Sequence, residues 1–432
     1  MNESIPAPGG LPLLGNALSI GRDPFGFVEN AVVNHGPVFR VSVPGLSFVC
    51  YADPALVERV LVTERDRYEK DPRERNLLGP LLGDGLLTAR DGTWERGREQ
   101  VQPAFYPGRL RAYGEVMLER TDGFVRDWSD GQRVDAYEWA RELTLSIVGT
   151  VVFGVEGVEE MRTISRGADA ITGRFEPSSV PLEVPLWVPT PANRRYRRAV
   201  DDLDGVVADL LDRRRASPDS GADLCATLLA AADDGAISDE RVRDHLLTML
   251  LAGHETTAIA LTYAMALLAT HPDEQARVLE EVREPETIDA GTALPRTDRA
   301  IQETLRLYPP TYLLFRQAAT DDVVAGYEIP AGTRICLPQW GIHRDERLFD
   351  APRSFRPDRW LDPDAYPDFA YFPFGGGPRA CIGRRFALLE LRLALATILR
   401  TVSLEATPET EWSPTPALTS RPDGPVPVRV RR

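Results

Sequence analysis

The sequence predicts a mainly α-helical protein with a small β portion, and three observations support this prediction. The stretch Asp239–Thr270 reads as one helix of about thirty residues, which would span roughly 45 Å, the width of a domain. Helical spacing of apolar residues recurs in several other stretches. Alternation of β-branched and aromatic residues is found in two short regions, Val38–Tyr51 and Val323–Leu337.

Each β-rich region contains a turn signal. Val38–Tyr51 alternates on both sides of Pro44-Gly45, which is typical of a hairpin, and Val323–Leu337 contains the turn-like run Pro330–Thr333. Ahead of them, Met1–Gly10 has neither a basic start nor an apolar stretch. We therefore expect an extended arm there rather than a signal peptide or a membrane anchor.

The shorter helices follow from apolar periodicity and from their end signals. Arg194–Arg215 has an apolar stripe, and Asp298–Tyr308 ends at Pro309-Pro310. The remaining predicted helices are Arg109–Trp128, Tyr137–Phe153, Asp273–Arg283 and Phe386–Val402.

The long stretch Asp239–Thr270 begins after Ser238, a favourable N-cap residue, and ends at Pro272. It is apolar almost all round, so a membrane span has to be considered. The four polar residues 254–257 interrupt it at the midpoint and leave apolar runs too short to cross a bilayer. We expect a buried central helix with polar residues at its middle.

The composition is that of a folded globular chain, with 432 residues, 43% hydrophobic and 27% charged. The net charge is −15, and Lys70 is the only lysine among 50 basic residues. Two explanations stay open: the codon bias of a GC-rich genome, or adaptation to a saline cytoplasm. The acidic surface argues against nucleic acid or an anionic membrane as the main partner. Four scattered cysteines without a CxxC pair favour a reducing cytoplasm over a disulfide framework.

The most informative motif is Phe372–Gly383, FPFGGGPRACIG. Gly375 and its glycine neighbours permit positive φ and close approach to a flat ligand. Cys381 follows where a helix begins, and the positive end of a helix stabilises a thiolate, the form that ligates iron. A glycine-rich turn that ends in a structural cysteine is the alternative.

The loop resembles the haem-binding loop of the cytochrome P-450 family, FxxGxRxCxG, at every defined position. The matching residues are Phe374, Gly377, Arg379, Cys381 and Gly383. The resemblance implies that Cys381 is the axial ligand of the haem iron and that Phe374, Gly375, Arg379 and Gly383 contact the haem.

Two further motifs in the same order suggest a structural triad. Glu303-Thr304-Leu305-Arg306 is ExxR, and Arg359 lies in a segment, FRPDRW, that resembles the family's next motif. The resemblance implies that Glu303, Arg306 and Arg359 lock together beneath the haem loop. A solvated ion pair of Glu303 and Arg306 on one helix face is the alternative.

Residues 252–257, AGHETT, match the family's central-helix pattern AGx[DE]T[TS]. The resemblance implies that Ala252 and Gly253 contact the haem and that Gly253 leaves room there for dioxygen. It also implies that Thr256 hydrogen-bonds oxygen and that Glu255 relays protons as the O–O bond breaks. The alternatives are a Thr256 hydroxyl bonded to its own i−4 carbonyl and a Glu255 in a buried salt bridge. No role is assigned to His254.

The haem carboxylates would be bound by residues far apart in the chain. Trp94 and Arg98 match the family's WxxxR, and Arg316 and Arg379 occupy its two further arginine positions. Guanidinium groups pair bidentately with carboxylates and stay charged.

The resemblance covers essentially the whole chain and implies the triangular helical prism of this family as a single domain over 1–432. An arm (1–20) would precede a small β-rich part (about 35–60 and 310–340), with the α-rich haem-binding body as the remainder. The segment 284–299 looks shorter than in many relatives.

The implied activity is that of a soluble, cytoplasmic, monomeric monooxygenase with haem b. It would insert one atom of dioxygen into an apolar lipid, fatty acid, isoprenoid or steroid-like substrate. The chain ends about fifty residues after Cys381, so we expect a separate electron donor, a ferredoxin or flavodoxin. Two alternatives stay open: a peroxide-driven peroxygenase or isomerase, and a non-catalytic haem sensor or carrier.

Two weaker expectations concern surfaces. A basic patch of Arg96, Arg384, Arg385 and Arg392 would suit an acidic electron donor, with ordinary solvated arginines as the alternative. The resemblance implies that the stretches Arg75–Leu87 and Thr163–Pro191 face the substrate, and their apolar composition favours an apolar substrate.

Overall fold

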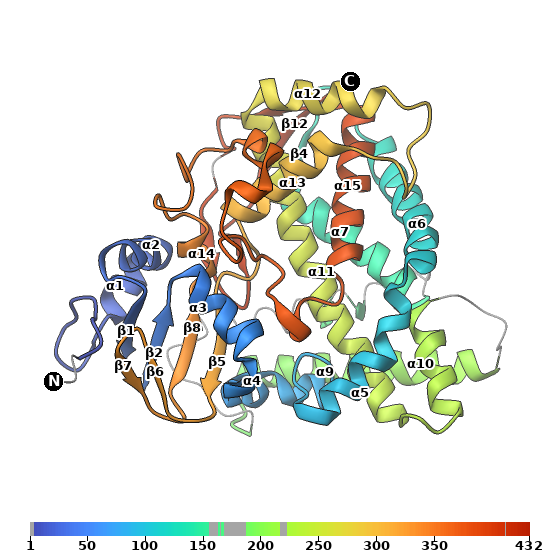
Figure 1. Cartoon of the computed structure of the whole chain (residues 1–432). Helices are drawn as coiled ribbons and strands as arrows, with labels where there is room; N and C mark the ends of the chain where they lie inside the picture. Colours follow the sequence, from blue (N-terminus) through green and yellow to red (C-terminus); the bar gives the residue numbers. More distant parts are fainter. Residues whose placement is uncertain (1–3, 155–162, 165, 168–186, 217–222, 411) are drawn as a thin grey trace. The chain divides into compact units, whose positions relative to one another are not determined.

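The structure is a computed structural model that describes residues 4–154, 163–164, 166–167, 187–216, 223–410 and 412–432 (Figure 1). Its elements are mostly helices with small β-sheets, which confirms the predicted fold class. The chain divides into two compact units: Met1–Glu74 with Gln302–Ile382 (unit 1), and Arg75–Ile301 with Gly383–Arg432 (unit 2). The expectation of one domain over 1–432 stays a prediction.

Unit 1 contains a five-stranded sheet in the order β1-β2-β8-β5-β3. Its strands are β1 (Val38–Val43), β2 (Leu46–Tyr51), β3 (Tyr68–Lys70), β5 (Leu314–Ala318) and β8 (Arg334–Leu337). β1 and β2 form the predicted hairpin, and Gly45 has a φ of +74° at its turn, where a side chain would be strained. β2 and β8 pair in parallel, and β3 and β5 pair so that Lys70 lies opposite Arg316.

The predicted strand region Val323–Leu337 contains three short strands. β6 (Asp322–Val324) and β7 (Tyr327–Ile329) form a separate hairpin, and only β8 joins the main sheet. The unit's short helices are α1 (Ala17–Arg22), α2 (Pro24–Asn34), α3 (Pro54–Glu58) and α14 (Gln339–Ile342). The two faces of the sheet carry separate apolar clusters. One includes Val49, Tyr51, Ile335 and Leu337, and the other includes Phe39, Val41, Cys50 and Cys336.

Unit 2 is mostly helical (Figure 1). Its helices are α5 (Asp91–Val101), α6 (Pro107–Arg126), α7 (Ala136–Val148), α9 (Pro191–Ala216), α10 (Leu224–Asp233), α11 (Asp239–Thr270), α12 (Pro272–Arg283) and α15 (Arg384–Thr401). One small sheet has the order β4 (Arg133–Asp135), β12 (Pro427–Arg431), β9 (Ser403–Ala406), and another pairs β10 (Pro414–Pro416) with β11 (Ser420–Pro422). The division between the units falls within α4 (Pro72–Leu82) and α13 (Pro295–Leu307).

The long helix α11 has the bounds that the sequence predicts. The Ser238 hydroxyl accepts a hydrogen bond from the backbone N–H of Arg241 at 3.3 Å and so caps the first turn. α7 and α15 pack against it, and most of its side chains are buried. No helix in the described part of the chain is long and apolar enough to cross a membrane.

Several predicted bounds shift at the ends of elements. The helix predicted over Tyr137–Phe153 ends at Val148 and continues as one π-helical turn, Gly149–Phe153. The segment 284–299 contains a short connection, since α13 already begins at Pro295. The Glu281 carboxylate accepts the backbone N–H groups of Arg296 and Thr297, so the first turn of α13 is capped from α12.

Candidate active site

The loop Phe372–Gly383, which lies in unit 1 up to Ile382, depends on its glycines. Gly375 and Gly377 have φ values of +68° and +65°, and a Cβ at Gly377 would lie 1.9 Å from the Leu61 carbonyl oxygen. The backbone N–H of Cys381 donates to the Phe374 carbonyl at 2.9 Å and closes the loop. These glycines therefore let the backbone turn tightly while it passes close to Leu61.

Cys381 differs from the other cysteines in its environment. Its side chain is exposed, whereas Cys50, Cys225 and Cys336 are buried. Burial raises the pKa of Cys225 to about 12 and the pKa of Cys50 well above its usual value, so these two stay neutral thiols. Among the described residues no three His, Cys, Asp or Glu side chains gather as a metal cage would require. The exposed Cys381 at the end of the loop fits the single thiolate ligand that the motif implies.

The expected triad lies within unit 1 and is fully hydrogen-bonded. Both oxygens of the Glu303 carboxylate accept from Arg306, at 2.8 and 2.9 Å, and one also accepts from Arg359 at 2.9 Å. Trp360, which the sequence analysis did not assign, donates from Nε1 to Glu303 at 3.0 Å. Glu303 and Arg306 have no exposed side-chain surface, so the alternative of a solvated ion pair is wrong.

Two unpredicted residues connect this triad to the glycine loop. Arg306 donates to the His343 carbonyl at 2.7 Å. The His343 ring accepts from the backbone N–H of Phe372 at 3.0 Å, and the Gln339 side chain donates to the Phe372 carbonyl at 2.7 Å. Burial lowers the pKa of His343, so the ring is neutral and can accept. At the start of the loop, both the backbone N–H and the backbone carbonyl of Phe372 are therefore hydrogen-bonded.

Cations gather beside the loop in unit 1. Burial lowers the pKa of Lys70, and the positive charges of Arg316 and Arg379 contribute to the same shift, while the nearby Glu74 carboxylate opposes it. Burial also lowers the pKa of Arg316, against the same Glu74. Lys70 and Arg316 therefore both lie near Glu74, and Arg379 lies near Lys70. A group of cations of this kind can bind an anionic ligand. Sequence analysis missed Lys70, whose place on β3 depends on pairing with the distant β5.

In unit 2, Trp94 and Arg98 lie one turn apart on α5. The Arg98 guanidinium is 5.8 Å from the centre of the Trp94 ring, a cation–π contact. The loop's last residue, Gly383, forms the N-cap of α15, and its carbonyl accepts from Ala387 at 2.8 Å.

The middle of α11 has an accessible strip in an otherwise buried helix. Ala252 is exposed and Gly253 and Thr256 are half-buried, whereas Glu255 and Thr257 are buried. A Cβ at Gly253 would meet only Val148, at 3.6 Å, which is ordinary contact. The protein's own packing therefore does not require a glycine here, although a glycine inside a helix costs about 1 kcal/mol relative to alanine.

The polar side chains in and beside this strip form hydrogen bonds within unit 2. The Thr256 hydroxyl donates to the Ala252 carbonyl at 2.6 Å, as the i−4 alternative expected, and Thr257 donates to the Gly253 carbonyl at 3.0 Å. Glu255 accepts from the Tyr137 hydroxyl at 3.4 Å. The Thr256 oxygen keeps lone pairs with which it can accept another hydrogen bond.

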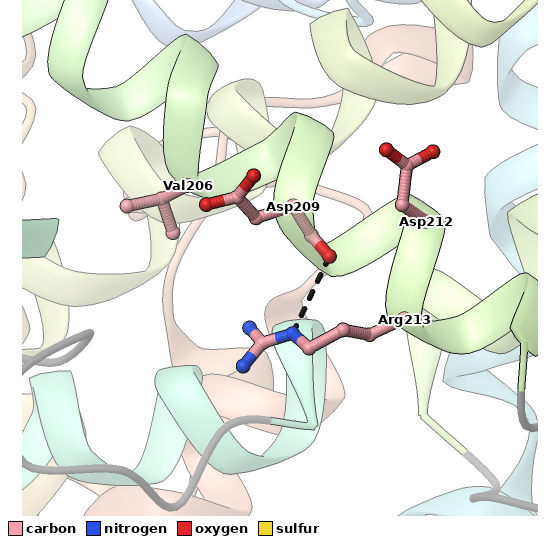
Figure 2. Close-up of a pocket in the computed structure, with 4 residues that line it drawn as sticks. All are labelled: Val206, Asp209, Asp212 and Arg213. Carbon is pink, nitrogen blue, oxygen red and sulfur yellow. Dashed lines mark hydrogen bonds between the residues drawn. The ribbon is translucent and has the colours of Figure 1, made fainter.

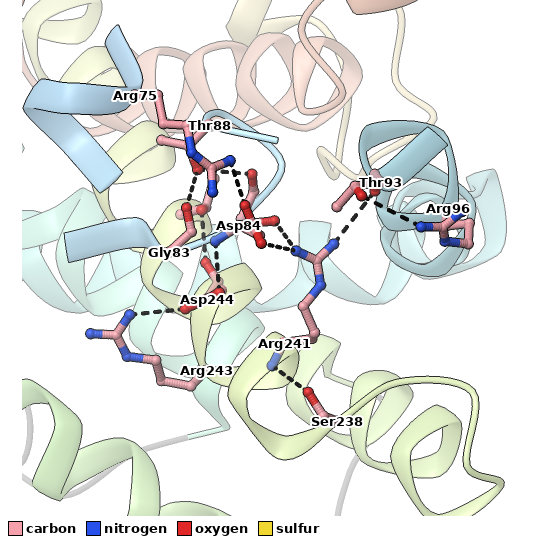
Figure 3. A network of polar contacts seen from close by, with 12 residues as sticks. Arg75, Gly83, Asp84, Thr88, Thr93, Arg96, Ser238, Arg241, Arg243 and Asp244 are labelled. Atoms are coloured by element: carbon pink, nitrogen blue, oxygen red, sulfur yellow. Dashed lines mark hydrogen bonds and ion pairs between the residues drawn. The ribbon is translucent and has the colours of Figure 1, made fainter. Parts of the chain in front are cut away.

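The segment between α4 and α5 is clamped to the start of α11 (Figure 3). The Arg241 guanidinium donates to the carbonyls of Asp84 and Thr93, and the Asp84 N–H donates to the Asp244 carboxylate at 2.8 Å. Gly83 has a φ of +50°, and a Cβ there would lie 2.2 Å from Asp244. The stretch Arg75–Leu87, expected to face the substrate, is therefore fixed at its C-terminal end.

Two further surface expectations concern the stretch Thr163–Pro191 and the predicted basic patch. Most of Thr163–Pro191 lies outside the described residues. In the expected basic patch, Arg392 forms a bidentate ion pair with Asp298, at 2.6 and 2.8 Å, so its charge is largely compensated. The same contact makes Arg392 a structural residue of unit 2.

A hollow of about 290 Å³ lies on α9, lined by Val206, Asp209, Asp212 and Arg213 (Figure 2). Arg213 donates there to the Asp209 carbonyl at 3.3 Å. All four residues come from one helix and none belongs to the motifs above. We therefore place no chemistry there.

Comparison with known proteins agrees with these motifs. The family model described as Cytochrome P450 matches residues 5–426. The chain is 33% identical over 429 residues to cyclooctatin synthase of Streptomyces melanosporofaciens, covering 95% of this chain and 92% of that protein. It is 32% identical to pentalenene oxygenase of Streptomyces avermitilis (94% and 93% covered) and 32% identical to cyclooctat-9-en-7-ol 5-monooxygenase of S. melanosporofaciens (94% and 90% covered). The chain belongs to the cytochrome P450 family, and it is a haem-containing monooxygenase.

Proposed function

We propose that this enzyme hydroxylates an apolar, isoprenoid-type substrate with electrons from a separate ferredoxin-type donor, and that its cofactor is haem b. The observation that carries the oxygen-dependent reaction is the strip on α11: a glycine without a packing role, Gly253, next to an intact Glu255-Thr256 pair. A peroxygenase, an isomerase or a haem carrier would not need this acid–alcohol pair.

The substrate class rests on the relatives' names and on the sequence. One relative is named for the alkene pentalenene and another for an alkenol. Among the apolar classes that the sequence suggested, these names favour isoprenoids over fatty acids and steroids. The apolar side chains of the Arg75–Leu87 segment suit such a substrate, since apolar surface excludes water from the reaction site.

The residues that match the family's motifs would hold the cofactor. Haem bound through the Cys381 thiolate supplies the dioxygen-activating chemistry. Arg316, Arg379 and Lys70 would pair with its carboxylates, because their side chains lie close enough together for the charges of Arg316 and Arg379 to lower the pKa of Lys70, and such a group of cations suits a carboxylate. Trp94 and Arg98 would serve the same purpose, as their match to the family's WxxxR motif implies. Gly375, Phe374 and Gly383 would shape the loop beneath the ring, and the Glu303–Arg306–Arg359 triad would hold that loop in place.

The acid–alcohol pair would manage protons. Thr256 would accept and pass on a proton at its hydroxyl oxygen, for which it keeps lone pairs while donating to Ala252. Glu255 would deliver that proton from the buried side of α11. Ala252 and Gly253 would keep the adjoining space open.

The test is turnover of the full-length holoprotein with two oxidant systems and two substrate panels. Isoprenoid alkenes and alcohols should shift the haem spin state and give hydroxylated product with NADH, a ferredoxin reductase and a ferredoxin. Fatty acids of equal carbon number should do so more weakly. Product formed with hydrogen peroxide but not with the reductant system would show a peroxygenase instead. Spin-state shifts with fatty acids alone would overturn the substrate class.

A further inference from the structure

α7 presents a polar stripe to the middle of α11. Tyr137, Arg141 and Thr144 are spaced i, i+4 and i+7, so they share one helix face. The Tyr137 hydroxyl donates to Glu255 at 3.4 Å, the Arg141 carbonyl contacts His254 Nε2 at 3.1 Å, and the Thr144 hydroxyl donates to the His254 carbonyl at 3.2 Å. Each residue of the stripe therefore contacts one of two adjacent residues of α11.

The Tyr137 side chain is suited to remain a neutral donor. Burial raises the pKa of its hydroxyl, the negative charge of Glu255 raises it further, and the charges of Arg141 and Arg421 act in the opposite direction. The Arg141 guanidinium lies 5.8 Å from the centre of the Tyr137 ring. A neutral phenol that donates to a carboxylate stabilises the ionised form of that carboxylate and fixes its orientation.

His254, although adjacent, does not compete for this function. Burial and the charge of Arg141 lower the pKa of His254 to about 4, so its ring is neutral above that pH. Its ring is bonded to Arg141 and its carbonyl to Thr144, both on α7. These two contacts hold the backbone next to Glu255, whose carboxylate accepts from Tyr137.

We propose that Tyr137 is the positioning residue for Glu255: its hydroxyl holds the carboxylate on the α7 side of α11 between proton deliveries to Thr256. This inference rests on the proposed role of Glu255 in proton delivery. Tyr137 itself touches neither substrate nor cofactor in this account. Without the Tyr137 hydroxyl, Glu255 would lose this hydrogen bond from α7. Proton delivery would then become slower, while substrate binding stayed the same.

The test compares Tyr137→Phe with Tyr263→Phe in the full-length holoprotein. Tyr263 is the matched control because it is a buried tyrosine on α11 whose hydroxyl donates to the Ser420 carbonyl at 3.3 Å. Tyr137→Phe should lower kcat about tenfold, the effect of one hydrogen bond to a charged group, with KM nearly unchanged and a larger solvent isotope effect. Tyr263→Phe should leave all three quantities at wild-type values.

A second readout does not depend on turnover. In the resting protein, the infrared carboxylate band that disappears in Glu255→Gln should shift in Tyr137→Phe and stay in place in Tyr263→Phe. If Glu255→Gln slows turnover while Tyr137→Phe changes neither the band nor kcat, the positioning role is wrong and the proposed role of Glu255 stands. If Glu255→Gln turns over like the wild type, both the proposed proton delivery and the positioning role are wrong.

Discussion

Two adjacent threonines on α11 have the same chemistry but different exposure. Thr256 is half-buried on the accessible strip beside Gly253, whereas Thr257 is buried and rotated by about 100° around the helix. Each hydroxyl donates to its own i−4 carbonyl. Only the position on the helix separates them, so the pair offers an internal control for the proposed chemistry.

Thr256→Ala should uncouple the reaction. Haem, thiolate and substrate binding remain, so the rate of reductant consumption should stay within about twofold of wild type, while product per reductant falls by about tenfold or more and hydrogen peroxide accumulates. Thr257→Ala should leave the ratio of product to reductant unchanged. The reverse pattern would mean that the site is misplaced by one residue, and no effect of either change would mean that ordered water alone delivers the proton.

At the scale of elements, the helix α11 can be predicted from local sequence, but the protonation of its histidines depends on the tertiary structure. His245 and His254 are both buried on it, and burial lowers the pKa of each to about 4. The unfolded chain takes up these protons near pH 6.5. Between pH 6.5 and about 4 the unfolded state therefore binds more protons, and the free energy of unfolding falls as the pH falls.

His254→Gln should weaken this pH dependence, because glutamine can still donate to the Arg141 carbonyl but takes up no proton. The loss of stability between pH 7 and pH 4 should be smaller than in the wild type by up to about 3 kcal/mol. Urea denaturation at pH 7, 6, 5 and 4 measures the difference. His35→Gln, outside α11, is the control variant. An unchanged slope in His254→Gln would show that this ring is already protonated in the folded protein.

The elements differ in how far the sequence predicts them. α11 was predicted with its bounds because Ser238 and Pro272 are local signals. β3 was missed because three residues, Tyr68–Lys70, become a strand only by pairing with β5, about 250 residues away. For the same reason Lys70 was not recognised beside Arg316. The contacts of His343 and Gln339 with Phe372 also join distant segments, so no local pattern marks them.

The candidate site residues were singled out by their resemblance to the family's motifs, and their roles stay predictions. Glu303 and Arg306 are three apart on a helix, and Arg359 matches the following motif, so a triad could be expected before its hydrogen bonds were known. The motifs could not predict two hydrogen bonds: the one that Trp360 donates to Glu303 and the one that Tyr137 donates to Glu255. Both partners depend on how neighbouring elements pack.

At the scale of the whole molecule, the net charge of −15 acts against the compact state. Many ion pairs lie at the surface, such as Asp122–Arg126, in which both side chains are more than half exposed. Such pairs contribute little and weaken further with salt. Salt weakens both the self-repulsion of the acidic chain and the attraction within surface ion pairs. Whichever of the two is larger decides whether salt raises or lowers the stability.

We expect the melting temperature to rise as potassium chloride increases from 20 to 200 mM, because screening reduces self-repulsion more than it weakens the surface pairs. A continued rise into molar salt would favour adaptation to a saline cytoplasm, and a plateau would favour codon bias as the reason for the single lysine. A falling melting temperature over 20–200 mM would show that attractive surface pairs dominate.

The central claim is that Cys381 is the thiolate ligand of the haem iron, and the spectrum of the reduced, carbon monoxide-bound protein tests it most directly. The wild type should show the red-shifted Soret band of thiolate ligation. Cys381→Ala should lose that band, while Cys50→Ala, Cys225→Ala and Cys336→Ala, at buried cysteines, should keep it wherever they fold. Persistence of the band in Cys381→Ala, or its loss in a folded, haem-loaded variant of one of the other three cysteines, would contradict the account.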